Sequence, residues 1–335
     1  MRTFTLLLLA ITLFTTNLCF SQSGKRIKIN NYTQTTINQM IAAGIDLRCG
    51  AIFEEDYIQI ELSEQDLDML DNTNITYDVL ISDLTTFYQE QTNEDLPLAI
   101  QQLEMAKAQS VAQRGSVASS SINNFLQYQG CDEMEWPVPL NFNLGSMGGC
   151  LTYTEAYQEM DDMKTLFPNL ISARTDASPS GTGQTTWGNT LGTATWPGQS
   201  IYYVRITGDE GTTPEGTRPQ MLFTSMTHSR EVSSLMGNIY FMWYLLENYS
   251  TDPAVKNLVD NNELYFIPIV NPDGLRWNET IAPSGGGLQR KNLRPNAGDT
   301  GTVDINNNVR GVDINRNFDY FWGTAGIGSS GTTTS

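Results

Sequence analysis

Apolar and polar positions follow their most regular pattern in the second half of the chain. From Thr152 to Leu166, large apolar residues recur at intervals of three and four, which is the spacing of one helix face. Phe167-Pro168-Asn169 then ends this predicted helix. A second helical pattern covers residues 231–249, and a shorter one follows Asp252-Pro253.

Short apolar runs before and between these helices predict strands. They lie at about residues 170–175, 201–206, 221–226 and 264–270. The run at 221–226 is nearly continuous, which predicts a strand buried on both faces, and the last run ends at the turn signal Asn271-Pro-Asp-Gly274. Strands and helices at crossover spacing predict an α/β fold with a mixed, partly parallel sheet flanked by helices.

The first half of the chain has a different organisation. Residues 27–88 interleave short helical and strand patterns, which predicts a small α+β unit. Residues 90–128 are rich in Gln, Asn, Ser and Ala, as in a linker. We therefore divide the chain into a leader at 1–22, a prosegment-like α+β unit at 23–90, a linker at 91–145 and a larger domain at 146–335.

The leader has the pattern of a secretory signal peptide. Met1-Arg2 precedes the apolar stretch Leu6 to Phe14, and a polar segment follows at 19–22. The apolar core is too short for a stable membrane anchor. We expect a secreted protein, extracellular or periplasmic, without a membrane anchor.

The charge balance excludes one class of partner. The chain has 335 residues with 37 acidic and 19 basic side chains, and its formal net charge is −18. A field of this sign repels phosphate backbones, so nucleic acid is not expected as a partner. An apolar content of 39% is that of a folded globular protein.

Candidate metal ligands stand where the apolar run at 221–226 gives way to a helix. His228 and Glu231 are three residues apart there, so an imidazole and a carboxylate could reach the same cation. A surface histidine beside a helix-capping acid would give the same pattern. The position favours the metal, because open α/β sheets bind ligands at the carboxyl ends of their strands.

Basic residues gather late in this acidic chain, which would suit an anionic ligand. They are Arg276, Arg290, Lys291, Arg294, Arg310 and Arg316. For Arg276 and Arg310 we favour a solvated loop in which they offset nearby acids. Asn315 next to Arg316 is more specific, because an amide and a planar guanidinium together suit the capture of a carboxylate.

Four short motifs follow one another in this half of the chain. They are His228-Ser-Arg-Glu231, Asn271-Pro-Asp-Gly274, Arg290-Lys291-Asn292 and Val312-Asp-Ile-Asn-Arg-Asn-Phe318. In this order and approximate spacing they resemble the zinc carboxypeptidases, the metallocarboxypeptidase family of carboxypeptidase A-like enzymes. The resemblance covers roughly residues 150–335 and implies a Zn2+ cofactor and the removal of C-terminal residues from peptides or proteins.

The resemblance also implies roles for single residues. His228 and Glu231 would be two of the three protein ligands of Zn2+, and Arg230 between them would contact the substrate. Asn315 and Arg316 would hold the terminal carboxylate of the substrate.

The arginine that would stabilise the oxyanion is less directly placed. The family pattern has its final arginine where this chain has Leu293. Either Arg294 takes the role with a shift of one residue, or Arg290 does, and we favour Arg294.

Two parts of the family's machinery have no counterpart in the sequence. The family's third zinc ligand is a distant downstream histidine and its general base is a glutamate farther on, whereas His228 is the only histidine here. We therefore expect residues 1–335 to be the N-terminal part of a secreted precursor, with little or no activity alone.

Residues 23–90 would be its prosegment or a separate surface module. Two alternatives stay open: a non-catalytic secreted protein that binds peptide C-termini, and a zinc enzyme that acts on cell-wall peptides or on amides of small acids.

Overall fold

Two four-stranded sheets organise the protein, with strand orders β2-β3-β1-β4 and β5-β6-β8-β7. The computed structural model describes residues 24–47, 50–114, 137–178, 182–189, 195–295 and 311–319. The leader expected at 1–22 and Arg310 lie outside these residues.

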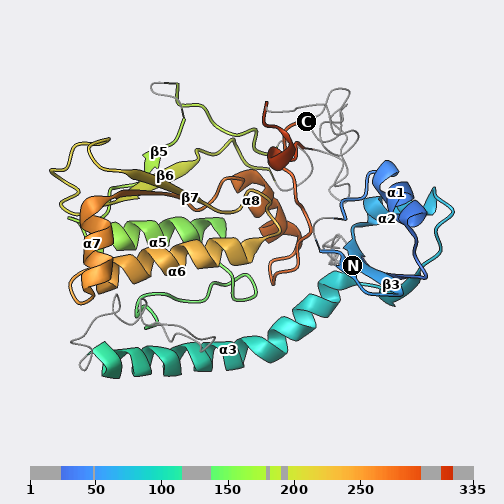
Figure 1. The fold of residues 1–335 in the computed structure, drawn as a ribbon, viewed down its shortest axis with the longest axis horizontal. Coiled ribbons are helices and arrows are strands. Elements are labelled where there is room, and N and C mark those ends of the chain that lie inside the picture. Colours follow the sequence, from blue (N-terminus) through green and yellow to red (C-terminus); the bar gives the residue numbers. More distant parts are fainter. Residues whose placement is uncertain are drawn as a thin grey trace, which may run out of the picture.

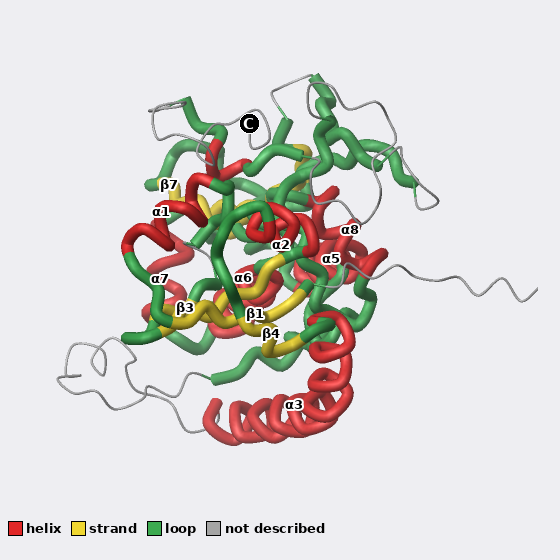
Figure 2. Tube along the Cα trace, turned by 90° about the vertical axis from the view of Figure 1, so that its right-hand side faces the viewer, coloured by secondary structure: helices red, strands yellow, loops and turns green. Residues whose placement is uncertain are grey.

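The first sheet and two helices form the N-terminal α+β unit. Its elements are β1 (Lys25–Asn30), α1 (Gln34–Ala42), β2 (Ile52–Phe53), β3 (Tyr57–Leu62), α2 (Glu64–Asp71) and β4 (Asp78–Ile81). All its strand pairs are antiparallel, and Figure 2 shows β1 between β3 and β4. In β3, Ile58, Ile60 and Leu62 alternate toward a core shared with the helices, as a half-buried strand requires.

A long helix, α3 (Leu84–Arg114), connects this unit to the rest of the protein. It runs through the first part of the segment expected to be a linker and extends beneath the second unit (Figure 1). Near its end, Ser110 Oγ accepts a hydrogen bond from the backbone N–H of Val138 at 2.6 Å. Lys107 Nζ donates to the side-chain oxygen of Asn143 at 2.9 Å. The helix is thereby attached to the second unit over its last turns.

The second unit has the mixed sheet that the sequence predicts. Its elements are α5 (Tyr153–Leu166), β5 (Thr175–Asp176), β6 (Tyr202–Ile206), β7 (Gln220–Thr224), α6 (Val232–Asn248), α7 (Pro253–Asn261), β8 (Glu263–Ile267), α8 (Pro272–Ile281) and the 3-10 turn η1 (Ile314–Arg316). β7 is parallel to β8, and β6 is antiparallel to it. The α/β prediction is therefore confirmed.

The core of this unit lies between the sheet and two helices. Figure 1 shows α5 and α6 side by side along one face of the sheet. Met160 and Met163 of α5 and Trp243 of α6 are at most 1% exposed. These residues occupy the helix positions that the apolar spacing marks, so the amphipathic pattern accounts for the packing.

Two sequence interpretations were wrong in detail. β7 is not buried on both faces: the successive residues Met221 and Leu222, which point to opposite faces, are 43% and 63% exposed. Among the described strands β7 pairs only with β8. Asn271-Pro-Asp-Gly274 is the start of helix α8 and not a free turn. Asn271 caps that helix by accepting from the backbone N–H of Gly274 at 3.0 Å, and Pro272 occupies its first position.

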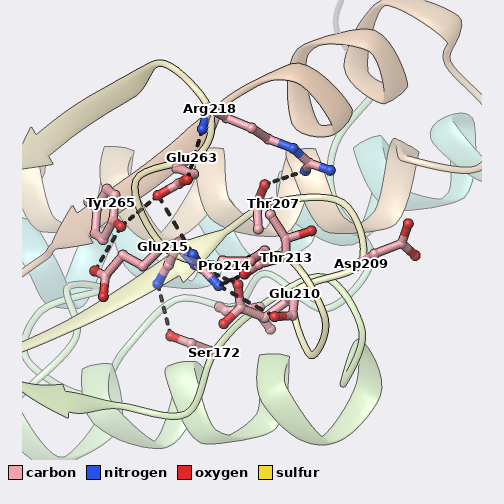
Figure 3. Close-up of polar contacts among 12 residues, drawn as sticks. Ser172, Thr207, Asp209, Glu210, Thr213, Pro214, Glu215, Arg218, Glu263 and Tyr265 are labelled. Carbon is pink, nitrogen blue, oxygen red and sulfur yellow. Dashed lines mark hydrogen bonds and ion pairs between the residues drawn. The ribbon is translucent and has the colours of Figure 1, made fainter.

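A buried charge cluster lies where β6 ends and where β7 and β8 begin, away from the carboxyl end of β7 (Figure 3). Glu263 is fully buried and accepts from the backbone N–H groups of Gly216, Thr217 and Arg218 at 2.9–3.1 Å. Arg205 lies 3.6 Å from the same carboxylate. One buried acid thus holds the loop before β7 against the sheet.

In the described part of the chain, no helix has both the length and the apolar character needed to cross a membrane.

Candidate active site

His228 and Glu231 come together just beyond the carboxyl end of β7. The chain leaves the sheet through Ser225 and Met226, and α6 begins at Val232 with Glu231 as its N-cap. His228 Nδ1 lies 2.9 Å from Glu231 Oε1, and the histidine is only 6% exposed. The strand end and the helix start therefore bring the two predicted metal ligands to one place.

Asp313 holds the other side of the imidazole ring. Its Oδ1 lies 3.2 Å from His228 Nε2, and the carboxylate is 5% exposed. If Nε2 carries the ring proton and donates a hydrogen bond to Asp313, the lone pair of Nδ1 faces Glu231. A carboxylate in this position fixes the tautomer and orientation of a metal-binding histidine.

Arg290 completes the cluster. Its Nε donates to Asp313 Oδ2 at 3.0 Å, and its Nη1 lies 3.4 Å from Glu231 Oε1. Arg290 is 8% exposed, so this cation faces the two acids in a poorly solvated site. Arg294, in contrast, is exposed on the surface.

The electrostatics of the cluster follow from these contacts. Burial alone would raise the pKa of Asp313, but the hydrogen bond to His228 and the charge and hydrogen bond of Arg290 prevail and hold this pKa well below its usual range. Asp313 is therefore ionised at every physiological pH and remains an acceptor for both neighbours.

Asn315 and Arg316 lie on η1, two and three residues after Asp313. The Asp313 carboxylate caps this turn by accepting from the backbone N–H of Asn315 at 3.0 Å. Arg316 Nη2 donates at 3.1 Å to Asp46 Oδ2, which comes from the N-terminal unit. The same carboxylate oxygen lies 3.6 Å from Arg290 Nη2. A carboxylate of the N-terminal unit thus bridges two arginines of the site.

Arg230 borders a cavity of about 400 Å³ between the two units. Glu61, Tyr88 and Thr92 line it on one side, and Arg230 and Glu231 line it on the other. Arg276 is elsewhere: its guanidinium lies over the rings of Tyr153 and Trp196 at 5.4 and 5.3 Å.

The chemistry of the donors fits Zn2+ in part. A neutral imidazole nitrogen and a carboxylate oxygen 2.9 Å apart are ligands that Zn2+ prefers. Catalytic zinc sites generally have three protein ligands, and among the described residues no group of three or more His, Cys, Asp or Glu side chains is placed to hold a metal ion. His228 and Glu231 have the chemistry of two ligands of such a site.

Two partners of this site were not foreseen from the sequence. Asp313 belongs to the motif Val312-Asp-Ile-Asn-Arg-Asn-Phe318, two residues before Asn315, and this position in the sequence could have indicated its role. Asp46 is 270 residues from Arg316, and no local pattern marks it.

Part of the chain is similar to known zinc carboxypeptidases. Residues 188–335 match the family model described as zinc carboxypeptidase. A zinc carboxypeptidase of Saccharothrix mutabilis subsp. capreolus is 31% identical over 131 residues, which are 39% of this chain and 27% of that protein. Metallocarboxypeptidase A of Trichophyton tonsurans is 34% identical over 133 residues, which are 40% of this chain and 28% of that protein. These matches span less than a third of each relative.

The fold is similar to that of a solved carboxypeptidase. The crystal structure of carboxypeptidase A from Helicoverpa armigera gives a TM-score of 0.51 at 18% identity, covering 94% of this chain and 62% of that chain. At this identity the likeness concerns the fold alone, and the fold is that of a carboxypeptidase.

Proposed function

We propose that this protein is a zinc-dependent metallocarboxypeptidase, a hydrolase that removes C-terminal residues from peptides or proteins. The convergence of His228, Glu231 and Arg290 at the carboxyl end of β7 carries the proposal, because it occurs inside the segment that matches the zinc carboxypeptidase family. The relatives are named as carboxypeptidases, so the comparisons do not favour a non-catalytic binding protein.

The residues of the site would divide the work as follows. Zn2+ held by His228 and Glu231 would activate a water molecule and polarise the scissile carbonyl. Asp313 would hold the imidazole in the orientation in which the lone pair of Nδ1 faces Glu231. Arg290 is the better candidate for stabilising the oxyanion, because it is buried beside the metal ligands whereas Arg294 is exposed.

Substrate recognition would depend on η1 and on Arg230. The guanidinium of Arg316 and the amide of Asn315 suit a free terminal carboxylate, and this requirement restricts the reaction to the chain end. Arg230 faces the cavity next to Glu231 and would contact the substrate.

Residues 23–90 would act as an inhibitory prosegment. The carboxylate of Asp46 already lies on Arg316 and within 3.6 Å of Arg290, where a substrate carboxylate would compete with it. We expect Asp46→Asn to raise the residual activity of the precursor, whereas the exposed Asp68→Asn serves as the matched control. Equal activity of the two variants would argue for a separate surface module.

The leader pattern at residues 1–22 supports secretion to the extracellular space or the periplasm. Amino-terminal sequencing of the exported protein would locate the cleavage site, and retention of the leader on a cytosolic product would contradict secretion.

The central experiment uses the protein expressed from its own gene. It is incubated with a peptide that has a free C-terminus and with the same peptide amidated, and products are followed by mass spectrometry. We expect release of single C-terminal residues from the free peptide only, and loss of this activity with a chelator or with His228→Gln. The proposal would be excluded if hydrolysis persisted with the chelator or in His228→Gln, or if the amidated peptide were cleaved as well as the free peptide.

Two arginine variants test the roles within the site. Arg290→Gln is expected to lower kcat by about two to three orders of magnitude, as for removal of an oxyanion donor. Arg294→Gln, its matched control, is expected to stay near the native rate. The reverse result would return the role to Arg294.

A further inference from the structure

Asn278 on α8 contacts the backbone beside both halves of the candidate site. Its Nδ2 donates to the carbonyl oxygen of Ser229 at 2.9 Å and to that of Gln289 at 3.0 Å. Its Oδ1 accepts from the backbone N–H of Gln289 at 2.9 Å. Ser229 directly follows His228, and Gln289 directly precedes Arg290. The side chain of Asn278 therefore joins the turn that contains His228 and Ser229 to the loop that contains Gln289 and Arg290.

Ser229 makes a second connection between the same two segments. Its Oγ donates to the carbonyl oxygen of Gln289 at 2.6 Å, and its backbone N–H donates to that of Arg290 at 3.2 Å. Ser229, Asn278 and Gln289 are each at most 2% exposed. A buried polar network with its partners in place holds its members in one arrangement.

The glycines around Asn278 allow this close approach. A Cβ at Gly274 would lie 2.3 Å from Ser229 Oγ, and a Cβ at Gly287 would lie 2.6 Å from Asn278 Cβ. Neither position has room for a larger residue. Helix α8 is therefore packed directly against the turn that carries His228 and Glu231.

We propose that Asn278 is a positioning residue that sets the distance between the metal ligands His228 and Glu231 and the guanidinium of Arg290. This inference deepens the proposed function and rests on it for its catalytic consequence. Without the amide, Ser229 and Gln289 lose the three hydrogen bonds that Asn278 makes to them, and the remaining contacts hold Arg290 less rigidly relative to Glu231. An error of about 1 Å in such a position can cost a hundredfold in rate.

The first test needs no catalysis. Because His228 is the only histidine, its imidazole nitrogens give the only such NMR signals of the chain. We expect Asn278→Ala to shift these signals, and Asn278→Ser to shift them less because a hydroxyl can still bond one segment. Asn248→Ala is the matched control: Asn248 is also buried, at 3% exposed, but its side-chain amide bonds only the Tyr244 carbonyl within α6.

The second test separates positioning from general stability. In the protein expressed from its own gene, Asn278→Ser is expected to lower kcat by about tenfold or more and to leave KM within about twofold, since misplacement of Arg290 affects the transition state most. Asn248→Ala should leave both constants near native. If Asn278→Ala does not fold, Asn278→Ser and Ser229→Ala provide both readouts.

The outcomes distinguish the two proposals. Imidazole signals that move no more in the Asn278 variants than in Asn248→Ala would overturn the positioning role, and so would a loss confined to KM. A native protein without peptidase activity would overturn the proposed function alone, because the NMR comparison would still decide whether Asn278 positions the His228 turn.

Discussion

Replacement of Glu263 by glutamine tests the buried charge cluster of Figure 3. The carboxylate accepts three backbone N–H groups, from Gly216, Thr217 and Arg218, and it lies 3.6 Å from Arg205. Glutamine has the same shape, but its NH2 group would face N–H donors and leave some of them unpaired. The guanidinium of Arg205 would also lose its buried counter-charge.

The size of the effect follows from these losses. Each unpaired buried donor costs about 1–3 kcal/mol, and removal of one partner of a buried ion pair costs about 3–5 kcal/mol. We therefore expect Glu263→Gln to lower the free energy of unfolding by about 3 kcal/mol or more. Urea denaturation followed by tryptophan fluorescence measures this value. The control is Glu215→Gln, because Glu215 is exposed and accepts from Tyr265 OH; its effect should stay within about 1 kcal/mol.

The stability difference between the native protein and Glu263→Gln should change with pH in a direction that the pKa of Glu263 determines. Burial would raise the pKa of Glu263, but the hydrogen bonds from Gly216, Gln220, Tyr265 and Arg218 prevail and lower it to about 2. A lowered pKa stabilises the fold above the ordinary carboxyl pKa, and this stabilisation is lost as the pH falls toward about 2. The native protein and Glu263→Gln should therefore differ less in their free energy of unfolding as the pH falls from the ordinary carboxyl pKa toward about 2. A difference below about 1 kcal/mol at neutral pH would refute the reasoning.

Three further predictions concern the site and the core. Asp313→Asn should weaken Zn2+ binding by about 10- to 100-fold, because the outer support of His228 is lost; isothermal titration calorimetry measures this, and unchanged affinity would contradict it. Gly274→Ala should cost about 1–3 kcal/mol in urea unfolding, since its Cβ would meet Ser229 Oγ at 2.3 Å, and a neutral result would show that α8 can move. Met160→Ala should cost about 2–5 kcal/mol because the side chain is fully buried, and a loss below 1 would mean that the core collapses around the gap.

The sequence predicts those parts of the fold that depend on local periodicity. The helix from Tyr153 and the strands at β6 and β8 follow from apolar spacing, because burial of one face is encoded within a few residues. The pattern at 221–226 misleads on burial, because it reports hydrophobicity and not which edge of the sheet a strand occupies. The polar composition at 90–114 indicates a linker, yet Gln, Glu and Ala are also good helix formers, and α3 uses them.

The candidate site also has contacts that the local sequence predicts and contacts that only the folded structure determines. His228 and Glu231 are three residues apart, so their proximity could be predicted from one turn of chain. Arg290 and Arg294 could not be separated by spacing, because the loop that carries them is irregular and only its packing shows which guanidinium is buried. Asp46 contacts Arg316 across 270 residues, a distance over which only the assembled fold determines a contact.

The outer position of β7 has a consequence for handling the protein. Among the described strands β7 pairs on one side only, and it carries the exposed side chains of Met221 and Leu222. An apolar strand that is paired on one side only is a template to which a strand of another molecule can add. Concentrated solutions of this chain should therefore form intermolecular β-structure, and a lysine in place of Leu222 should delay its appearance.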